Sequence, residues 1–467
     1  MCYINGILSG AALYPDDDDF SQGSSVGISI GSNDCTIDLY NIRIYDNDLT
    51  RYQILDNWIA DTVDGYTLLQ RYNHNNIYDA YGSIVISNLP NDLPYLVIES
   101  ETLPQYKGDK KIVSGYYVDP LNPLKSFSFA NAQIDVQGTS SQFYARKNYK
   151  IKFNSGFNMT ESGETVSKYQ MRYNSVPTKT FCFKADVASS EGANNVELAR
   201  LYNDICPYKT APQVEDDEIR QGIDGFPIVI FWTDLINEKT SFLGKYNFNN
   251  DKGTDEVFGF DTGDESWEIR NNVSDRVLWK SADYSGSGWK DDFEARYPED
   301  NEVVTNLANM AAWLVTTDRS AATDDPLAES VTYDGITYTT DSEEYRLAKF
   351  KAEVEDYWSV QDLVFYYLFT EIFLMVDSRG KNMFPTLYDG DAWALLPYDF
   401  DTAIGIDNNG KLAFGWSLED TDTTAGGADV YNAQNSVLWV NTRDAFGPQI
   451  KAMYQNLRSQ GLLSYNE

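Results

Sequence analysis

Hydrophobic and polar residues alternate in several short runs, most clearly in residues 127–153. In the second half of this block, apolar side chains occupy one face and lysines the other: Tyr149, Ile151 and Phe153 against Lys150 and Lys152. Such a period of two is typical of a half-buried strand. The block therefore predicts a strand, a tight turn and a second strand.

Further runs of the same kind predict other elements. Strands are expected at residues 3–7, 26–30, 36–40, 42–45, 93–100, 225–231, 242–248, 383–388 and 392–398, where apolar or alternating residues are bounded by turn formers. Helical spacing predicts helices at residues 194–205, 303–314, 361–376 and 439–457. The third of these helices is nearly all apolar, and Ser359 with Asp362 predicts a capping box at its start. Residues 318–342 are expected to form a polar loop.

Acidic and amide residues gather at one end of the hairpin expected around Asp389 and Gly390. An Asp-Gly pair between two strands is a strong turn signal. A two-residue turn would place Asn382 opposite Pro397 and bring it close to Asp399.

These residues are also spaced like parts of a phosphoryl-transfer site. Asp377, Asn382 and Asp399, with Asp401 as a fourth, would supply hard oxygen ligands that suit Mg²⁺ or Ca²⁺. A protein kinase catalytic loop uses the same order: an Asp near the substrate hydroxyl, an Asn on the metal five positions later, then a metal-binding Asp. A pair of solvated acidic turns is the competing interpretation.

Composition excludes several classes of function. The 467 residues, a length typical of about three domains, contain 36 Lys and Arg against 71 Asp and Glu, a formal net charge of −35. This charge disfavours binding to nucleic acid or to anionic membranes and favours cations or basic partners. One His and four Cys without CxxC spacing disfavour a zinc site or a disulfide scaffold. We expect no membrane insertion and no signal peptide in this chain.

Residues upstream would suit a phosphate group. If the second strand of the 127–153 block already runs from Arg146, Lys147 points to its apolar face, where a charge is costly unless it meets an anion. The turn before it, QGTSS at residues 137–141, is small and polar enough for backbone amides and hydroxyls to approach phosphate oxygens.

Residues 90–460 resemble the spore coat protein H (CotH) family. QGTSS at 137–141 with RKNYKIKF at 146–153 is similar to that family's glycine-serine turn and its Lys-Lys-x-Tyr strand. Asp377 to Asn382, and PYDFD at 397–401 with Gly405, are similar to its Asp…Asn and Pro-Trp-Asp-Leu-Asp…Gly motifs. Gln137 stands where the family usually has Arg, Tyr398 replaces Trp, and residues 184–195 follow the family only loosely.

The resemblance implies a fold and a set of roles. The fold would be α+β, an atypical protein-kinase-like two-lobed domain with an insertion at about residues 250–342. ATP and Mg²⁺ would be its cofactors. Asp377 would be the catalytic base. The remaining roles would be phosphate contact by Lys147, Gly138, Ser140 and Ser141, and metal binding by Asn382, Asp399 and Asp401. Glu197 is the candidate partner of Lys147, although pairing within its own helix is the commoner fate of such a residue.

The N-terminal residues imply a surface protein. Residues 1–61 resemble the C-terminal part of a laminin-G-like, concanavalin-type β sandwich, and residues 62–89 are interpreted as a linker. Together with a kinase-like domain, this partial sandwich resembles bacteriophage or bacterial surface proteins. The implied location is the virion, the cell surface or the extracellular space.

Two functions of different classes follow. The first is an ATP- and Mg²⁺-dependent kinase-like domain that phosphorylates Ser or Thr of a structural or surface protein, with basic substrates favoured by the negative charge. It requires Lys147 to face Asp399 across an open cleft; otherwise a cation site is what remains. The second is a virion tail, fibre or cell-surface structural protein that assembles with other such proteins and is catalytically silent. Carbohydrate binding through some of the 33 Tyr and 10 Trp is a third possibility.

Overall fold

The computed structural model divides the chain into two compact units: Met1–Pro90 with Thr240–Phe242, and Asn91–Lys239 with Leu243–Glu467. It describes residues 93–138, 141–144, 146–187, 194–269, 293–299, 305–375, 378–379, 382–388, 392–406 and 436–463, with Leu89 and three short N-terminal strands.

The first unit contains those three short strands. β1 (Cys2–Ile4) and β2 (Ile7–Gly10) form an antiparallel hairpin. β3 (Ile84–Val85) pairs with β12 at Ser241 and Phe242. β3 and Leu89 lie within the predicted linker, residues 62–89. The other strands predicted for the partial sandwich, and the rest of that linker, lie outside the described residues.

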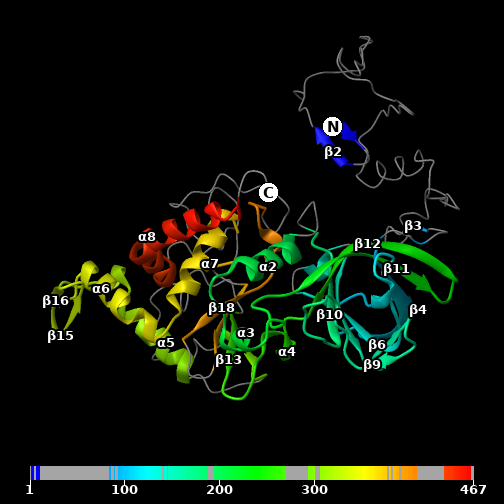
Figure 1. Cartoon of the computed structure of the whole chain (residues 1–467), viewed down its shortest axis with the longest axis horizontal. Helices are drawn as coiled ribbons and strands as arrows, with labels where there is room; N and C mark the ends of the chain where they lie inside the picture. Colours follow the sequence, from blue (N-terminus) through cyan, green and yellow to red (C-terminus); the bar gives the residue numbers. More distant parts are fainter. Residues whose placement is uncertain are drawn as a thin grey trace, which may run out of the picture. The chain divides into compact units, whose positions relative to one another are not determined.

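Seven strands of the second unit close into a barrel (Figure 1). Their order is β5, β4, β11, β12, β10, β7 and β6, and the barrel closes because β5 also pairs with β6. The bounds are β4 Tyr95–Ser100, β5 Lys111–Val118, β6 Phe127–Gln137, β7 Asn148–Phe153, β10 Thr180–Lys184, β11 Gly225–Asp234 and β12 Lys239–Asn250. β8 (Phe157–Met159) and β9 (Thr165–Val166) extend the sheet beyond β6.

The apolar side chains of the alternation predicted for residues 149–153 lie in the core of the barrel. Tyr149, Ile151 and Phe153 are buried, whereas Lys150 and Lys152 are exposed, so the predicted parity of β7 is confirmed. The rings of Phe153 and its neighbours pack at short range, with centroids 5.8 Å apart for Phe127 and Phe153. Such pairs stabilise a core beyond the area that they bury.

The fold class predicted from the resemblance is wrong. A closed seven-stranded barrel with additional strands and helices is dominated by β structure and is not a two-lobed kinase-like domain. Alternation predicts where strands run and which face is buried, but it does not tell which strands pair. The sequence did not reveal that β5 pairs with β6 as well as with β4.

Helices and a smaller sheet form the rest of the second unit. The sheet has the order β14 (Phe293–Tyr297), β13 (Glu265–Ile269), β17 (Met383–Leu387), β18 (Ala394–Pro397). The larger helices are α2 Asn194–Ile205, α5 Thr305–Thr316, α6 Glu343–Glu353, α7 Val360–Ile372 and α8 Val437–Ser459. Shorter helical segments are η2 Pro123–Lys125, η3 Ser141–Phe143, α3 Ala211–Glu215, α4 Asp255–Phe258, η6 Arg319–Ala321, η7 Val354–Asp356 and η8 Phe400–Thr402. The predicted helices are therefore confirmed, with shifted ends.

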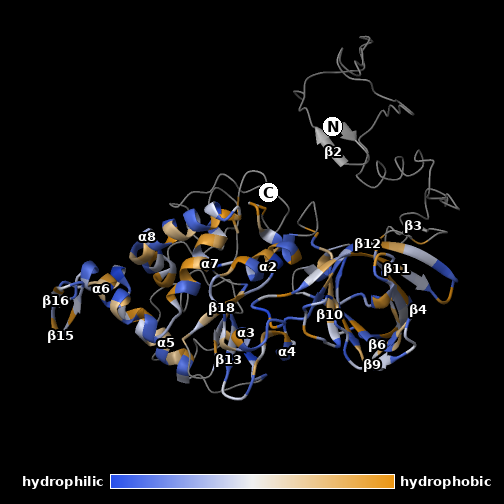
Figure 2. Cartoon of the chain, in the orientation of Figure 1, coloured by the Kyte–Doolittle hydropathy of each residue, from blue (hydrophilic) through white to orange (hydrophobic). Residues whose placement is uncertain are grey.

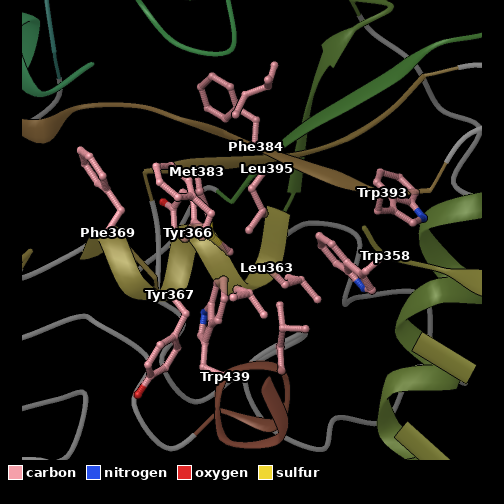
Figure 3. Close-up of a cluster of buried hydrophobic side chains, with 14 of the residues drawn as sticks. Trp358, Leu363, Tyr366, Tyr367, Phe369, Met383, Phe384, Trp393, Leu395 and Trp439 are labelled. Carbon is pink, nitrogen blue, oxygen red and sulfur yellow. The ribbon is translucent and has the colours of Figure 1, made fainter. Parts of the chain in front are cut away.

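Helix α7 lies at the centre of this part of the molecule. Figure 3 shows its aromatic side chains between β17 and β18 on one side and Trp439 of α8 on the other. The cap predicted at Ser359 is confirmed, since its hydroxyl accepts a hydrogen bond from the backbone N–H of Asp362. The carboxylate of Asp362 instead accepts from the N–H of Leu395 at 2.6 Å, so the capping box is only half formed.

The predicted loop at residues 318–342 contains structure. β15 (Pro326–Tyr333) and β16 (Ile336–Thr340) form an antiparallel hairpin, so that prediction is wrong. Its side chains are mostly exposed, which left no hydrophobic alternation to detect.

Figure 2 shows that α8 carries both hydrophobic and hydrophilic residues, as an amphipathic helix does. Within the described residues no helix is long and apolar enough to cross a membrane.

Candidate functional site

A set of polar side chains lies where the barrel meets the helical part of the second unit. We call this set the seam; it consists of Lys184, Asp186, Asn195, Asn247, Tyr398 and Asp399. Lys184 ends β10 and pairs in register with Asn247 of β12. Asn195 is on α2, and Tyr398 and Asp399 connect β18 to η8. The seam therefore joins the barrel to the sheet and helices that follow it.

The strand period explains why a lysine is buried here. Phe181 and Phe183 of β10 point into the barrel core, so Cys182 and Lys184 must point outward, toward the helical part. The side chain of Lys184 is only 6% exposed. Its Nζ lies 3.2 Å from the hydroxyl of Tyr398 and 3.4 Å from Oδ1 of Asp399. A buried ammonium requires such partners.

The charge of Lys184 is permanent near neutral pH. Burial alone would lower its pKa, but the Asp399 carboxylate, with smaller contributions from Tyr398, Cys182 and Asp401, outweighs burial and raises the pKa well above the ordinary value. The seam thus keeps a fixed positive charge in a place of low solvent access.

Asp399 is held in an unusual backbone conformation. Its φ of 60° and ψ of 61° are left-handed, a state that costs energy for a residue other than glycine and is often found at functional sites. Asn195 holds this turn from both sides. Its Oδ1 accepts from the N–H of Phe400 at 3.1 Å, and its Nδ2 lies 3.5 Å from Oδ1 of Asp399.

Asp186 is a second carboxyl group of the seam. Its pKa is raised to about 7, mainly by burial, with the charge of Lys184 lowering the pKa and that of Asp399 raising it. Its Oδ2 accepts from Nδ2 of Asn247 at 2.5 Å. Oδ1 of Asn247 is buried and, among the described residues, has no hydrogen-bond partner. An acceptor left in this way is expensive unless a ligand or water meets it.

The donor set fits a hard cation that shares its ligands with a phosphate. In the described part of the chain, no three acidic, Cys or His side chains lie close enough to hold a metal ion on their own. Mg²⁺ in phosphate-binding sites commonly uses only one or two carboxylates, completed by phosphate oxygens and water. Asp186, Asp399 and the free amide oxygen of Asn247 are of that kind.

The lysine predicted to face the phosphates lies elsewhere. β7 begins at Asn148, so Lys147 precedes the strand, and its Nζ donates to the backbone carbonyls of Gln142 at 2.8 Å and Tyr144 at 3.3 Å. Because carbonyl groups satisfy it, Lys147 does not require an anion. The required approach of Lys147 to Asp399 is absent from the described contacts, and Lys184 occupies that position.

Glu197 does not pair with Lys147 either. Its Oε2 lies 2.5 Å from a guanidinium nitrogen of Arg200, three positions along α2. This is the local pairing that the sequence offered as the alternative.

The hairpin register also differs from the prediction by one residue. Met383, not Asn382, is opposite Pro397. The carbonyl of Asn382 accepts from the N–H of Tyr398 at 2.9 Å, which places Asn382 beside Tyr398 instead of on the face expected for Asp399. A shift of one residue exchanges the two faces of a strand.

The other predicted site residues are divided between the seam's surroundings and the glycine-serine turn. Asp401 is in η8 and contributes to the field on Lys184. Gly138 has a φ of 99°, and a Cβ there would fall 1.9 Å from Oγ of Ser141. This turn is thus closed by its own serine, which also accepts from Asn148. Ser140 and Asp377 lie outside the described residues.

The sequence did contain a signal for the residues that it missed. In FCFK at residues 181–184, the two phenylalanines share one face of the strand, so Lys184, at the end of this buried strand, lies on the other face. That placement predicts a lysine on the outer face of the core strand. It does not predict that a second layer covers this face, which is what buries Lys184. No family model matches the chain, and no curated protein matches it.

Proposed function

We propose that the seam binds a nucleoside triphosphate such as ATP together with Mg²⁺, and that the protein transfers the terminal phosphoryl group to a hydroxyl, such as Ser or Thr of a structural or surface protein. The observation that carries the proposal is the buried Lys184 ammonium 3.4 Å from Asp399, whose backbone is left-handed. The condition that Lys147 face Asp399 is not met, so the proposal gives Lys184 the phosphate-contacting role that the sequence assigned to Lys147. The proposal does not depend on a kinase-like fold.

Each seam residue has a part in this function. Lys184 provides a permanent positive charge for phosphate oxygens in a place with little water, where such a charge acts strongly. Asp399 and Asp186 would hold the cation, and Asn195 keeps Asp399 in position. Bound Mg²⁺ would neutralise the charge that develops on the phosphoryl oxygens.

The base for the acceptor hydroxyl remains a prediction from sequence. Asp377 is the candidate, five positions before Asn382. The similarity of PYDFD at residues 397–401 to the CotH motif supports the metal role of Asp399, because Asp399 is the first Asp of that run.

Phosphate transfer to the protein itself and to a basic Ser peptide tests the proposal. Lys184→Met and Asp399→Asn should each lower the rate by about 100-fold or more, as the loss of a group that stabilises charge in a transition state does. Asp377→Asn tests the base. Lys147→Met is the matched control and should keep nearly the wild-type rate, because Lys147 contacts only backbone carbonyls among the described residues.

Two results would contradict the proposal. One is the absence of both a nucleotide-dependent rise in melting temperature and phosphate transfer by the wild-type chain. The other is a rate that falls with Lys147→Met and not with Lys184→Met.

A structural role in a virion or on a cell surface is the second candidate. It is favoured by the fact that Lys184 and Asp399 already compensate each other's charge, as a structural ion pair would. In that case Lys184→Met would destabilise the protein although no nucleotide binds. Electron microscopy of the source material would then find the chain in repeating copies.

A further inference from the structure

A polar pocket of about 320 Å³ lies beside α2. Its walls come from α2, α3 and the loops around residues 172–174 and 216–224. The volume is in the range of pockets that hold small ligands. None of its lining residues belongs to the seam.

The pocket is rich in cations although the chain has a net charge of −35. Its lining includes four basic side chains: Arg172, Arg200, Lys209 and Arg220. The acidic lining residues Asp204 and Asp217 are exposed, so water screens their charge, whereas Asp224 is buried at the base.

Positive charge is in excess at the base of the pocket. Nη1 of Arg172 and Nε of Arg220 lie 3.3 Å and 3.8 Å from the carboxylate oxygens of Asp224. The side chains of the two arginines are only 25% and 12% exposed. One carboxylate thus serves two guanidinium groups that have little contact with water. Arg220 also donates to the backbone carbonyls of Asn174, Asp217 and Ile219, which carry no compensating charge. A partly buried positive charge in excess is costly, and an anion in the pocket would relieve that cost.

Arg172, at the base of the pocket, has further N–H groups with which it can bind an anion. Among the described residues, the guanidinium of Arg172 contacts only Asp224 and does so through one nitrogen. A guanidinium fork suits the paired oxygens of a phosphate or carboxylate. Lys209 and Arg200 are exposed on the same lining, and Arg200 is also paired with Glu197 of its own helix, which is not part of the lining.

We propose that this pocket binds a phosphoryl dianion, either as free phosphate or as the phosphate of a small phosphorylated molecule. Several cations around one small volume favour a doubly charged group over a single carboxylate. The proposal is independent of phosphoryl transfer at the seam, because it uses other residues and needs no nucleotide.

Isothermal titration calorimetry of the full chain tests it, with inorganic phosphate, O-phosphoserine and ribose 5-phosphate as probes and sodium chloride at equal ionic strength as the control. Arg200→Gln and Lys209→Gln should each raise the dissociation constant by about 3- to 10-fold. Both side chains are exposed, so folding is not at stake. Lys179→Gln, another exposed lysine but outside the pocket, should leave the constant unchanged.

A second variant tests the base of the pocket. Arg172→Gln combined with Asp224→Asn removes one cation together with its buried partner. Arg220 loses the same carboxylate but keeps the backbone carbonyls of Asn174, Asp217 and Ile219 as acceptors. It should weaken phosphate binding by about 10-fold or more while seam activity persists. Preferred binding of free phosphate or of a phosphorylated molecule would identify the source of the group. No saturable binding of any probe up to about 10 mM, or equal weakening by Lys179→Gln, would overturn the proposal.

Discussion

Two lysines show how far the direction and burial of a side chain can be predicted from sequence. Lys147 was expected to point inward because it continues the parity of Tyr149 and Ile151, but β7 starts one residue after it. Parity has no meaning outside the strand, and Lys147 instead donates to carbonyls of the preceding turn. Lys184 keeps its parity and is buried by a layer that comes more than 200 residues later in the chain, at Tyr398 and Asp399.

The pairing of Lys184 and Asp399 should be measurable as a coupling in stability. Lys184→Met leaves Asp399 without its main cation and should lower the free energy of unfolding by about 2–3 kcal/mol, less than for a fully buried pair, because the Asp399 side chain is 27% exposed. Asp399→Asn leaves a buried ammonium unpaired and should cost a similar amount. The double variant should recover part of the loss.

Urea denaturation of the four proteins gives the coupling free energy. We expect about 1–2 kcal/mol between the two residues. Lys147→Met serves as the control, and should show no coupling to Asp399→Asn, since Lys147 contacts Gln142 and Tyr144. Additive effects of Lys184→Met and Asp399→Asn would mean that the pair is not a unit.

At the scale of elements, the sequence predicted where strands exist better than how those strands pair. The strands of the β17–β18 hairpin were predicted, yet their register was wrong by one residue, because an Asp-Gly pair favours a two-residue turn without excluding a longer connection. That single residue decides whether Asn382 or Met383 is opposite Pro397. Predictions that depend on a face of a strand are therefore less secure than the strand itself.

Closure of the barrel depends on a glycine whose role is visible only in the structure. Gly115 of β5 lies at an irregularity in the pairing with β6, where the register shifts between Val113 and Gly115. A Cβ at Gly115 would fall 2.0 Å from the carbonyl oxygen of Val97 on β4. No real side chain tolerates that approach, so either β4 or β6 would have to move.

Gly115→Ala should therefore lower the free energy of unfolding by about 3 kcal/mol, in the upper range for overpacking. Gly108→Ala is the matched control: its φ of 94° is positive, like the 151° of Gly115, but nothing lies within 4 Å of the added carbon. It should cost about 1 kcal/mol from backbone strain alone. Thermal and urea denaturation measure both, and equal losses would show that the close approach to Val97 is not limiting.

At the scale of the molecule, local motifs and the global fold gave different answers. The acidic turn at residues 397–401 places Asp399 beside the buried Lys184, although the fold inferred from the same motif is wrong. A short motif reports the chemistry of a few side chains, whereas the fold depends on pairings between distant strands such as β5 and β6. The site chemistry inferred from this motif therefore stays a prediction although the inferred scaffold is wrong.

Two buried carboxyl groups should make the stability of the whole chain depend on pH in an unusual direction. Burial raises the pKa of Asp362 to about 7, opposed by hydrogen bonds from the N–H of Leu395 and the side chains of Tyr202 and Gln221. Asp186 is raised to the same value. Between the ordinary pKa near 4 and about 7, the folded state binds more protons than the unfolded state. The free energy of unfolding should then fall as pH rises through this window and level off above it.

The size of the fall can be tested with one variant. A shift of about three pKa units corresponds to about 4 kcal/mol per group at most, so the wild-type protein should be several kcal/mol more stable at about pH 5.5 than at about pH 8. Asp362→Asn keeps an acceptor for Leu395 and cannot ionise, so it should remove about half of the difference and leave the part due to Asp186. Repulsion among the surface acids of this −35 chain acts on both proteins alike, so comparing their slopes in urea denaturation isolates Asp362. Identical slopes, or a stability that rises with pH across this window, would show that Asp362 is already ionised in the folded state.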